Sequence, residues 1–446
     1  MSFTQLFVSV VIVGALMALA RRFRGLGQRQ NDYPPGPPTL PIIGNILQMP
    51  KEKGHLQFEK WDKEYGPMYS LILGGQTVIV ISSEHAMRDL LEKRGAVYSS
   101  RPDSYLSHDV LSGGLRVVFM HLEKFSLLSG SHTANLLNIF PILRRLPDFL
   151  LPTRRRAKKL HQEELKLFVE KYTAPCTSAM FAEAQEKENV PDDLMAYFSG
   201  SLLQAGSETT MATLLGFVQA MVIFPDVSKA AQAEIDSVCG DRLPSMGDWK
   251  DLAYIRGCIK ESLRWMPTTI LGVPHSVEVE DQYMGYRTPK NATIIYNVWA
   301  IHNDPSRYPN PRDFDPTRWA NDNQSSYESA RNEDVTQRDH YSFGMGRRMC
   351  LAMNPVDQFM FLAIAYLLWA FDFNRAVDGK AMQEIIPDME DLSNGLFTMP
   401  NPFAADIRPW SGKRAEQIRE AWQRAKTELL DQDLQWKEIP VSPFKD

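Results

Sequence analysis

The stretch "SFGMGRRMCLAMN", residues 342–354, places one of only four cysteines behind two glycines and two adjacent arginines. Glycines such as Gly346 permit a tight turn and a close backbone approach, so that N–H groups can point at a thiolate. Positive charge such as that of Arg348 lowers a thiol pKa and can hold anionic groups of a ligand. Cys350 could instead be an inert core thiol, the commonest fate of an unpaired cysteine. The surroundings favour a ligand-holding loop.

The composition is that of a globular protein with an ample core: 446 residues, 44% hydrophobic and 23% charged. A net charge of −5 gives no reason to expect nucleic-acid binding. The four cysteines lie far apart, with neither disulfide-scaffold density nor the C-x-x-C spacing of metal sites. The sequence therefore predicts a reducing compartment and, because no linker-like boundary follows residue 40, a single domain.

An uncharged, mostly apolar run occupies residues 2–20 and is just long enough to cross a bilayer. Three arginines follow within the next four positions, and basic residues prefer the cytoplasmic side. A cleaved signal peptide would carry its charge before the run. The "PPGPP" of residues 34–38 then forms a stiff spacer. We expect residues 1–30 to be a single-pass anchor and residues 31–446 to form the domain on its cytosolic side.

Hydrophobic periodicity predicts a mainly helical chain with small β-sheets, an α+β arrangement. Helices are expected at 154–187 with a break at Pro175, and at 190–224, 226–239, 252–265, 356–373 and 413–430, with a strand at 78–81. The polar segment 320–339 is predicted to be a surface loop.

The longest helical segment contains "AGSETT", residues 205–210. Gly206 costs up to ~1 kcal/mol in a helix interior relative to alanine, and threonine hydroxyls can bond back to carbonyls and loosen the turn. A helix kink with a buried threonine would explain the pattern. The functional interpretation is that Glu208 and Thr209 relay protons into a buried site, while Gly206 leaves room for a flat ligand.

A second constellation is "KESLRW", in which Glu261 and Arg264 share one helix face at i, i+3 spacing. Most such pairs are solvated and contribute little. Downstream, "PRDFDPTRW" offers a second guanidinium, Arg318, beside Trp319. The three charges are predicted to form a buried clasp that locks this segment onto the helix.

An ionised, dry and hydrogen-bonded thiolate is what a haem iron ligand requires. The loop around Cys350 resembles the pattern F-x-x-G-x-R-x-C-x-[GA] of the cytochrome P450 family, through Phe343, Gly346, Arg348, Cys350 and Ala352. "AGSETT", "KESLR" and "PRDFDPTRW" are similar to three further family segments, in the family's order and spacing. The anchor and "PPGPP" resemble a eukaryotic microsomal member, and the wording around "AGSETTMATLLGFVQAMVIFP" looks like fungal members that oxidise secondary metabolites.

This resemblance implies a cytochrome P450 fold with one haem-binding domain behind the anchor. Cys350 would be the metal ligand, the axial thiolate of haem b, whose electron push favours O–O cleavage. Glu208 and Thr209 would deliver protons for oxygen activation. Arg348 and His275 would hold the haem propionates.

Other implied positions surround the cofactor. Phe343 would pack by the sulfur and tune it, and Gly346 and Gly206 would leave room for the loop and the haem. Substrate contacts are expected from residues 268–273, from residues 105–115, from Ala205 and its preceding turn, and from Leu396 and Phe397.

The implied activity is a haem-thiolate monooxygenase that inserts one oxygen atom from O2 into a small lipophilic substrate, in a fungal secondary-metabolite pathway. Electrons would come from NADPH through a separate reductase, at the endoplasmic reticulum membrane. A non-catalytic haem-binding or membrane-associated remnant of the family is the alternative. A third possibility is a haem-thiolate isomerase or dehydratase without a reductase, against which Glu208 and Thr209 argue.

The resemblance is interrupted in one place. After the segment matched by "VLSGGLRVVFM", the family normally carries a W-x-x-x-R helix that contacts the propionates, and this chain has no tryptophan between Trp61 and Trp249. We expect a deletion near residues 120–135, through a gene-model error, a natural shortening or loss of haem. Such a deletion would expose apolar neighbours and weaken the haem site. Pro355, shortly after the cysteine, is tolerable in the first turn of a helix.

Overall fold

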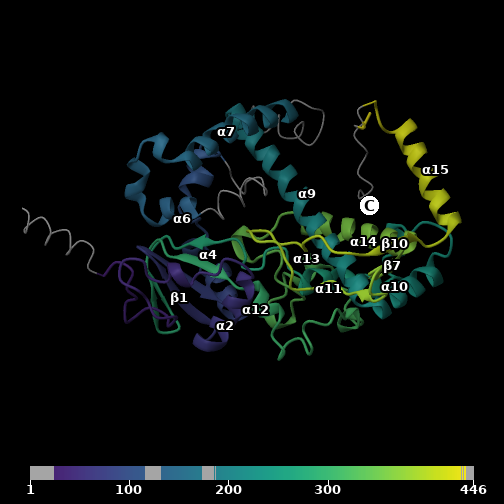
Figure 1. The fold of residues 1–446 in the computed structure, drawn as a ribbon, viewed down its shortest axis with the longest axis horizontal. Coiled ribbons are helices and arrows are strands. Elements are labelled where there is room, and N and C mark those ends of the chain that lie inside the picture. The colour runs from purple at the N-terminus through teal and green to yellow at the C-terminus, as the bar shows by residue number, and fades with distance from the viewer. Residues whose placement is uncertain are drawn as a thin grey trace, which may run out of the picture.

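The computed structural model describes residues 25–115, 132–172, 185, 187–432, 434 and 436–437. Helices dominate, and a small sheet region lies at the N-terminal end of the molecule (Figure 1). The helices longer than three residues are α2 Gly54–Tyr65, α3 Glu84–Met87, η2 Arg88–Lys93, α4 Gly95–Tyr98, η3 Tyr105–Val110, α6 His132–Ile139, η4 Pro141–Arg145, α7 Pro152–Tyr172, α9 Asp192–Ile223, α10 Pro225–Val238, α11 Ala253–Trp265, α12 Val298–His302, η7 Pro316–Trp319, α13 Ser326–Ser329, α14 Met353–Ala370 and α15 Gly412–Glu428. Short 3-10 turns are η1 Ile46–Gln48, η5 Asp148–Leu150, η6 Met246–Asp248, η8 Val335–Gln337 and η9 Gly346–Arg348.

The main sheet has four strands in the order β1 (Met68–Leu73), β2 (Gln76–Ile81), β6 (Thr293–Tyr296) and β3 (His275–Ser276). β1 and β2 form an antiparallel hairpin, β6 runs parallel to β2, and β3 runs antiparallel to β6. The remaining strands pair in twos: β4 Asp281–Tyr283 with β5 Tyr286–Thr288, β7 Phe371–Asn374 with β10 Asp406–Pro409, and β8 Ala376–Val377 with β9 Glu384–Ile385. The predicted combination of many helices with small sheets is confirmed.

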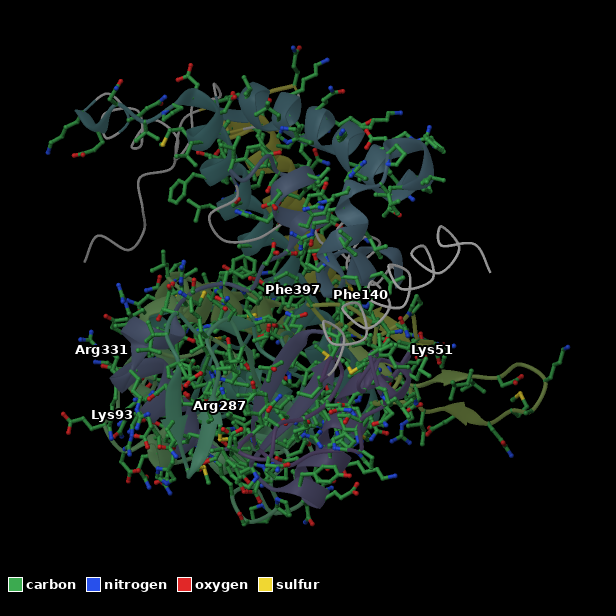
Figure 2. All side chains as sticks on the ribbon, turned by 90° about the vertical axis from the view of Figure 1, so that its left-hand side faces the viewer. Lys51, Lys93, Phe140, Arg287, Arg331 and Phe397 are labelled. Carbon is green, nitrogen blue, oxygen red and sulfur yellow. The ribbon has the colours of Figure 1, made fainter. Side chains whose placement is uncertain are left out.

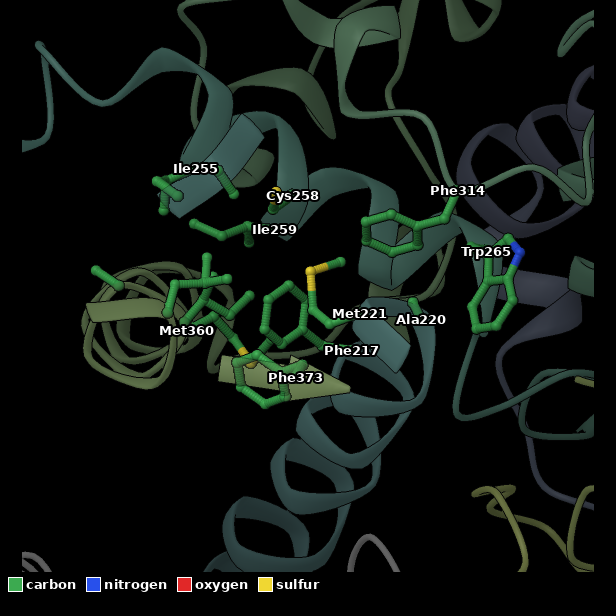
Figure 3. Packing of buried hydrophobic residues seen from close by; sticks show 14 of the residues in the cluster. Phe217, Ala220, Met221, Ile255, Cys258, Ile259, Trp265, Phe314, Met360 and Phe373 are labelled. Carbon is green, nitrogen blue, oxygen red and sulfur yellow. The ribbon is translucent and has the colours of Figure 1, made fainter. Parts of the chain in front are cut away.

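The main core forms where α9, α10, α11 and α14 meet (Figure 3). Phe217 and Met221 of α9 pack with Ile255 and Ile259 of α11 and with Met360 of α14, and all five are buried. Every residue of α11 from Ile255 to Trp265 is buried. The core therefore fixes the helix that carries "AGSETT" against the helix that carries "KESLRW" and the one that follows Cys350.

One predicted helix, at residues 356–373, differs from the structure at both ends. α14 begins earlier than expected and ends at Ala370, because Phe371 to Asn374 pair as β7 with β10. Pro355 lies in the first turn of α14, as expected. The predicted strand at 78–81 and the helices ending near residues 223, 238 and 265 are confirmed within two residues. The predicted break at Pro175 lies outside the described residues.

The prediction that segment 320–339 is a surface loop is partly wrong. Ser326, Ser329 and Asp339 are buried, although the segment is polar. The backbone N–H of Ser326 donates to Asp357 of α14 at 2.7 Å, and Lys260 of α11 lies 3.3 Å from the Asp339 carboxylate. Polar side chains hold this segment against two core helices, which a reading based on hydrophobicity misses.

The expected anchor, residues 1–30, lies almost wholly outside the described residues, as does most of the expected deletion point. In the described part of the chain, no single helix has the length and hydropathy needed to cross a membrane. α9 and α10 meet these criteria only as a pair bent by 107°.

Candidate haem-thiolate active site

The loop around Cys350 is held by two close backbone contacts. At Gly346 φ is +73°, and a Cβ there would lie 2.0 Å from the Leu91 carbonyl oxygen of η2. The backbone N–H of Cys350 donates to the Phe343 carbonyl at 2.9 Å. Only glycine allows both the left-handed conformation and the approach to η2. The tight turn and close approach expected of this loop are therefore present.

The Cys350 side chain lies exposed at the surface of the described structure. Desolvation by the surrounding protein atoms raises the pKa of this thiol, and the backbone N–H of Ala352 acts in the opposite direction by hydrogen-bonding to the sulfur. The raised pKa keeps the unliganded thiol protonated at neutral pH. A metal ion would therefore bind Cys350 with release of a proton.

Three basic side chains lie together beside the loop, the charged Arg101 and Arg348 and the neutral His275. Arg101 and Arg348 both lower the pKa of His275, after desolvation, and Arg348 also lowers the pKa of Arg101. Arg348 Nε donates to the Ser99 carbonyl at 3.0 Å, and Arg101 Nη1 donates to the Pro274 carbonyl at 2.8 Å. Like charges held together repel one another, so this cluster suits a ligand with carboxylates.

The structure brings His275 and Arg348 together as expected, and it adds Arg101, which the sequence analysis missed. Arg101 stands alone between "SS" and a proline, with no charge pattern that marks it. The bridge between Ser100 and Ser276 carries it to the edge of the sheet beside His275. Pairing between segments about 175 positions apart could not be read from one sequence.

His275 is buried in a defined protonation state. Its Nδ1 lies 2.7 Å from the Tyr98 carbonyl oxygen, which can only accept, so Nδ1 carries the hydrogen. Desolvation, aided by Arg101, lowers its pKa to about 4. The neutral ring then presents a lone pair at Nε2, and it can donate to a carboxylate from that atom only after taking up a proton.

The "AGSETT" stretch lies within α9. Thr209 Oγ1 donates to the Ala205 carbonyl at 2.6 Å, the back-bonding expected for threonine in a helix. A Cβ at Gly206 would meet no atom within 4 Å, so the space beside it is open. Glu208 is half-buried, and as the direct neighbour of Thr209 it projects from a different side of the helix. A proton relay between the two would need a bridging water.

Two of the four segments expected to contact substrate, residues 268–273 and residues 396–397, meet at Thr268. Its hydroxyl lies 3.0 Å from that of Thr213, one turn after Thr209, and its carbonyl accepts from the Thr398 N–H at 2.7 Å. Phe397 is buried at this junction and Leu396 is half-buried. Another of these segments, residues 105–115, buries Leu106 and Leu111 in a separate cluster with α6 and α7.

The predicted clasp is confirmed. Glu261 and Arg264 are fully buried and form two contacts of 2.8 and 2.6 Å. Arg318 Nε reaches Glu261 at 3.3 Å, and Trp319 Nε1 donates to it at 3.1 Å. The clasp ties the segment before the cysteine loop to α11.

A cavity of about 570 Å³ lies beside the cysteine loop, and Gly346 and Met349 form part of its wall. Basic side chains predominate in the rest of the wall. Figure 2 shows two of them, Lys93 and Arg331, at the same edge of the molecule. The wall also includes Arg88, Glu92, Ala330, Glu333 and Arg338.

Comparison with known proteins defines the class. The sequence profile of the Cytochrome P450 family matches residues 34–125 and 120–401. The chain is 43% identical to the cytochrome P450 monooxygenase fogE of Aspergillus ruber (strain CBS 135680), over 97% of this chain and 97% of the relative. It is 43% identical to virE of Hypocrea virens, over 96% and 94%, and 41% identical to fsoB of Humicola fuscoatra, over 98% of each.

The chain thus belongs to the cytochrome P450 family. It is an oxidoreductase of the fungal secondary-metabolite type, a haem-thiolate monooxygenase that receives electrons from a reductase and acts on a lipophilic substrate. The alternative of a non-catalytic remnant is not favoured. The residues fit the haem that this class uses. The Ala352 N–H donates to the cysteine sulfur, and the basic cluster of Arg101, His275 and Arg348 can bind the haem carboxylates.

Proposed function

We propose that Cys350 would hold haem b through its thiolate and that the chain uses NADPH-derived electrons, passed on by a separate reductase, to oxygenate a small lipophilic molecule. Two observations carry this proposal: the Cys350 sulfur accepts a hydrogen bond from the Ala352 N–H, and Arg348 of the same loop belongs to a basic cluster with Arg101 and His275. When bound, the haem would supply the electron push that favours O–O cleavage.

The basic cluster would bind and orient the cofactor through its carboxylates. Arg101 and Arg348 supply permanent charge, while His275 takes up a proton when a carboxylate arrives, because the new negative charge raises its pKa. Phe343, whose ring centroid lies 5.3 Å from that of His340, would cover the sulfur.

On the other side of the cofactor, Thr209 and Glu208 would move protons toward the site of oxygen activation. The Thr209 hydroxyl donates to Ala205 at rest, which leaves its oxygen lone pairs able to accept from a water that Glu208 protonates. Gly206 would leave room for the flat ring, and the junction at Thr268 would hold the substrate against it.

Electrons would enter from the side of the cavity beside Gly346 and Met349, since the loop that carries the sulfur forms its wall. The basic side chains there, Arg88, Lys93 and Arg331, suit an acidic surface on a reductase. Residues 1–30 would anchor the enzyme in the endoplasmic reticulum membrane as a single span, with the catalytic domain, residues 31–446, on the cytosolic face.

Within that domain we propose a deletion near residues 120–135. Two observations support it: the family profile matches in two pieces that meet at residues 120–125, and the alignment with fogE has 524 positions although the chain has 446 residues.

The experiment is to express the chain with haem supplied, reduce it, add carbon monoxide and record the absorption band of thiolate-ligated haem. We expect the band in the parent and in Cys239→Ala, a control that removes a buried cysteine far from the loop. Cys350→Ala should abolish it. Folded protein without the band, or a band that survives Cys350→Ala, would contradict the proposed function.

A further inference from the structure

The hydroxyl of Tyr296, at the end of β6, lies where several segments of the candidate site meet. Tyr296 is 5% exposed, and its ring stands edge-on to that of His275, with 5.8 Å between the ring centroids. Its hydroxyl oxygen accepts a hydrogen bond from the Val273 N–H at 3.1 Å. A Cβ at Gly344 of the cysteine loop would lie 3.2 Å from the same oxygen. No step of the proposed function uses this buried hydroxyl.

Among the described residues, no acceptor takes the hydrogen of the Tyr296 hydroxyl. A phenol carries one hydrogen to donate, and the contact with Val273 uses only an oxygen lone pair. Desolvation raises the pKa of Tyr296, so the hydroxyl keeps this hydrogen at neutral pH. Leaving a buried donor unpaired costs free energy. The hydroxyl is therefore a free donor for an acceptor on a bound molecule.

The space beside the hydroxyl has room for such an acceptor. Apart from its chain neighbours, a Cβ at Gly344 would meet no described atom within 4 Å other than the Tyr296 oxygen. At Gly344 φ is +73°, a left-handed backbone conformation that glycine adopts without strain. This side of the cysteine loop is therefore free of side chains, and a group of a ligand can reach the hydroxyl there.

The charges around the hydroxyl favour an anionic acceptor. Arg101 donates to the Val273 carbonyl at 3.1 Å, so Arg101 and Tyr296 hold the two polar backbone groups of one residue. Arg101 also lies close enough to oppose the rise that desolvation causes in the pKa of Tyr296. Beyond desolvation, the charge of Arg348 lowers the pKa of both Arg101 and His275. A donor in these surroundings favours a carboxylate over a neutral acceptor, because hydrogen bonds to charged groups are the stronger ones.

We propose that the Tyr296 hydroxyl donates to a haem carboxylate, as a neutral fourth member of the carboxylate site that Arg101, His275 and Arg348 form. The inference rests on the proposed function and deepens it. Unlike His275, Tyr296 already carries the hydrogen that it donates, so it would bind the carboxylate without taking up a proton. Because it also accepts from the Val273 N–H, it would tie a segment expected to contact substrate to the cofactor.

The experiment measures porphyrin affinity in the full chain expressed without haem, through the quenching of tryptophan fluorescence. The two probes are haem and iron etioporphyrin, which carries alkyl groups where haem carries its carboxylates. Tyr296→Phe removes only the hydroxyl and should weaken haem binding about tenfold, as expected for the loss of one hydrogen bond to a charged group. It should leave the affinity for iron etioporphyrin unchanged, because this probe offers the hydroxyl no acceptor.

Tyr69→Phe is the matched control, since Tyr69 is also buried and its hydroxyl donates to the Phe58 carbonyl at 3.2 Å in another core cluster. It should change neither affinity. Equal weakening of both porphyrins by Tyr296→Phe would mean that the hydroxyl only supports Val273, and would overturn the inference. Unchanged haem binding by Tyr296→Phe would overturn it too, while the proposed function stands. A parent chain that binds no haem contradicts both.

Discussion

Replacing Glu261 with glutamine should destabilise the protein by a predictable amount. The Glu261 carboxylate accepts hydrogen bonds from Arg264 at 2.8 and 2.6 Å, from Trp319 at 3.1 Å and from the Asp315 N–H at 3.0 Å, and Arg318 lies 3.3 Å away. Glutamine keeps the shape but leaves the buried Arg264 without its counter-charge. Breaking one partner of a buried pair costs ~3–5 kcal/mol.

The assay is thermal and urea unfolding followed by tryptophan fluorescence. An unfolding entropy of ~2.1 cal/mol/K per residue gives ~0.9 kcal/mol/K for a chain of this size, so ~4 kcal/mol lowers the melting temperature by ~4 °C. Trp319→Phe, which removes one hydrogen bond, should cost about 1 kcal/mol and remains measurable if Glu261→Gln does not fold.

Glu416 and Arg419 on α15 provide the matched control. They have the same i, i+3 spacing and a 3.0 Å contact, but both side chains are exposed. Glu416→Gln should change stability by no more than about 0.5 kcal/mol, because water screens an exposed pair. If Glu261→Gln and Glu416→Gln unfold alike, the clasp does not stabilise the fold and the reasoning from burial is refuted.

Three further predictions follow from the site and its surroundings. Haem affinity of the His275→Phe variant, which cannot take up a compensating proton, should rise about tenfold per pH unit below the pKa of the Cys350 thiol when measured by titration, because binding releases the thiol proton; a flat profile would contradict this. His275, with a pKa near 4 when folded, contributes stability above its ordinary pKa of 6.5 that is lost as pH falls through 4, and its replacement with phenylalanine should remove about 3 kcal/mol of that dependence. Asp357 changes the stability with pH in the opposite direction. Burial raises its pKa to about 6, so the stability it contributes at low pH is lost as pH rises through 6. Asp357→Asn should therefore stabilise the protein at pH 7 but not at pH 4. In urea titrations at several pH values, parallel curves for parent and variants would count against both assignments.

The local part of the fold could be predicted from the sequence because local rules govern it. The ends of α9, α10 and α11 follow from proline positions and apolar spacing, and the Glu261 clasp follows from charges placed on one helix face. The turn at Gly346 follows from glycine chemistry.

The predictions from sequence that failed concern features that depend on contacts between distant segments. Arg101 joins the basic cluster only through the pairing of Ser100 with Ser276, and Phe371 leaves the helix only because Pro409 pairs with it. Segment 320–339 looked exposed because buried polar groups satisfied by Asp357 and Lys260 carry no hydrophobic signal.

The contacts of the cysteine loop also determine when this loop can fold during synthesis of the chain. Gly346 rests on Leu91, and Arg348 bonds to Ser99, so the loop is assembled from residues about 250 positions apart in the chain. Domains fold as they leave the ribosome, and contacts of such long range form last. His275 and Tyr98 can meet well before Cys350 is made. The growing chain therefore passes through a stage in which Arg101 and His275 are in place but neither Arg348 nor the iron ligand has been made, and haem captured at that stage would be held by its carboxylates alone.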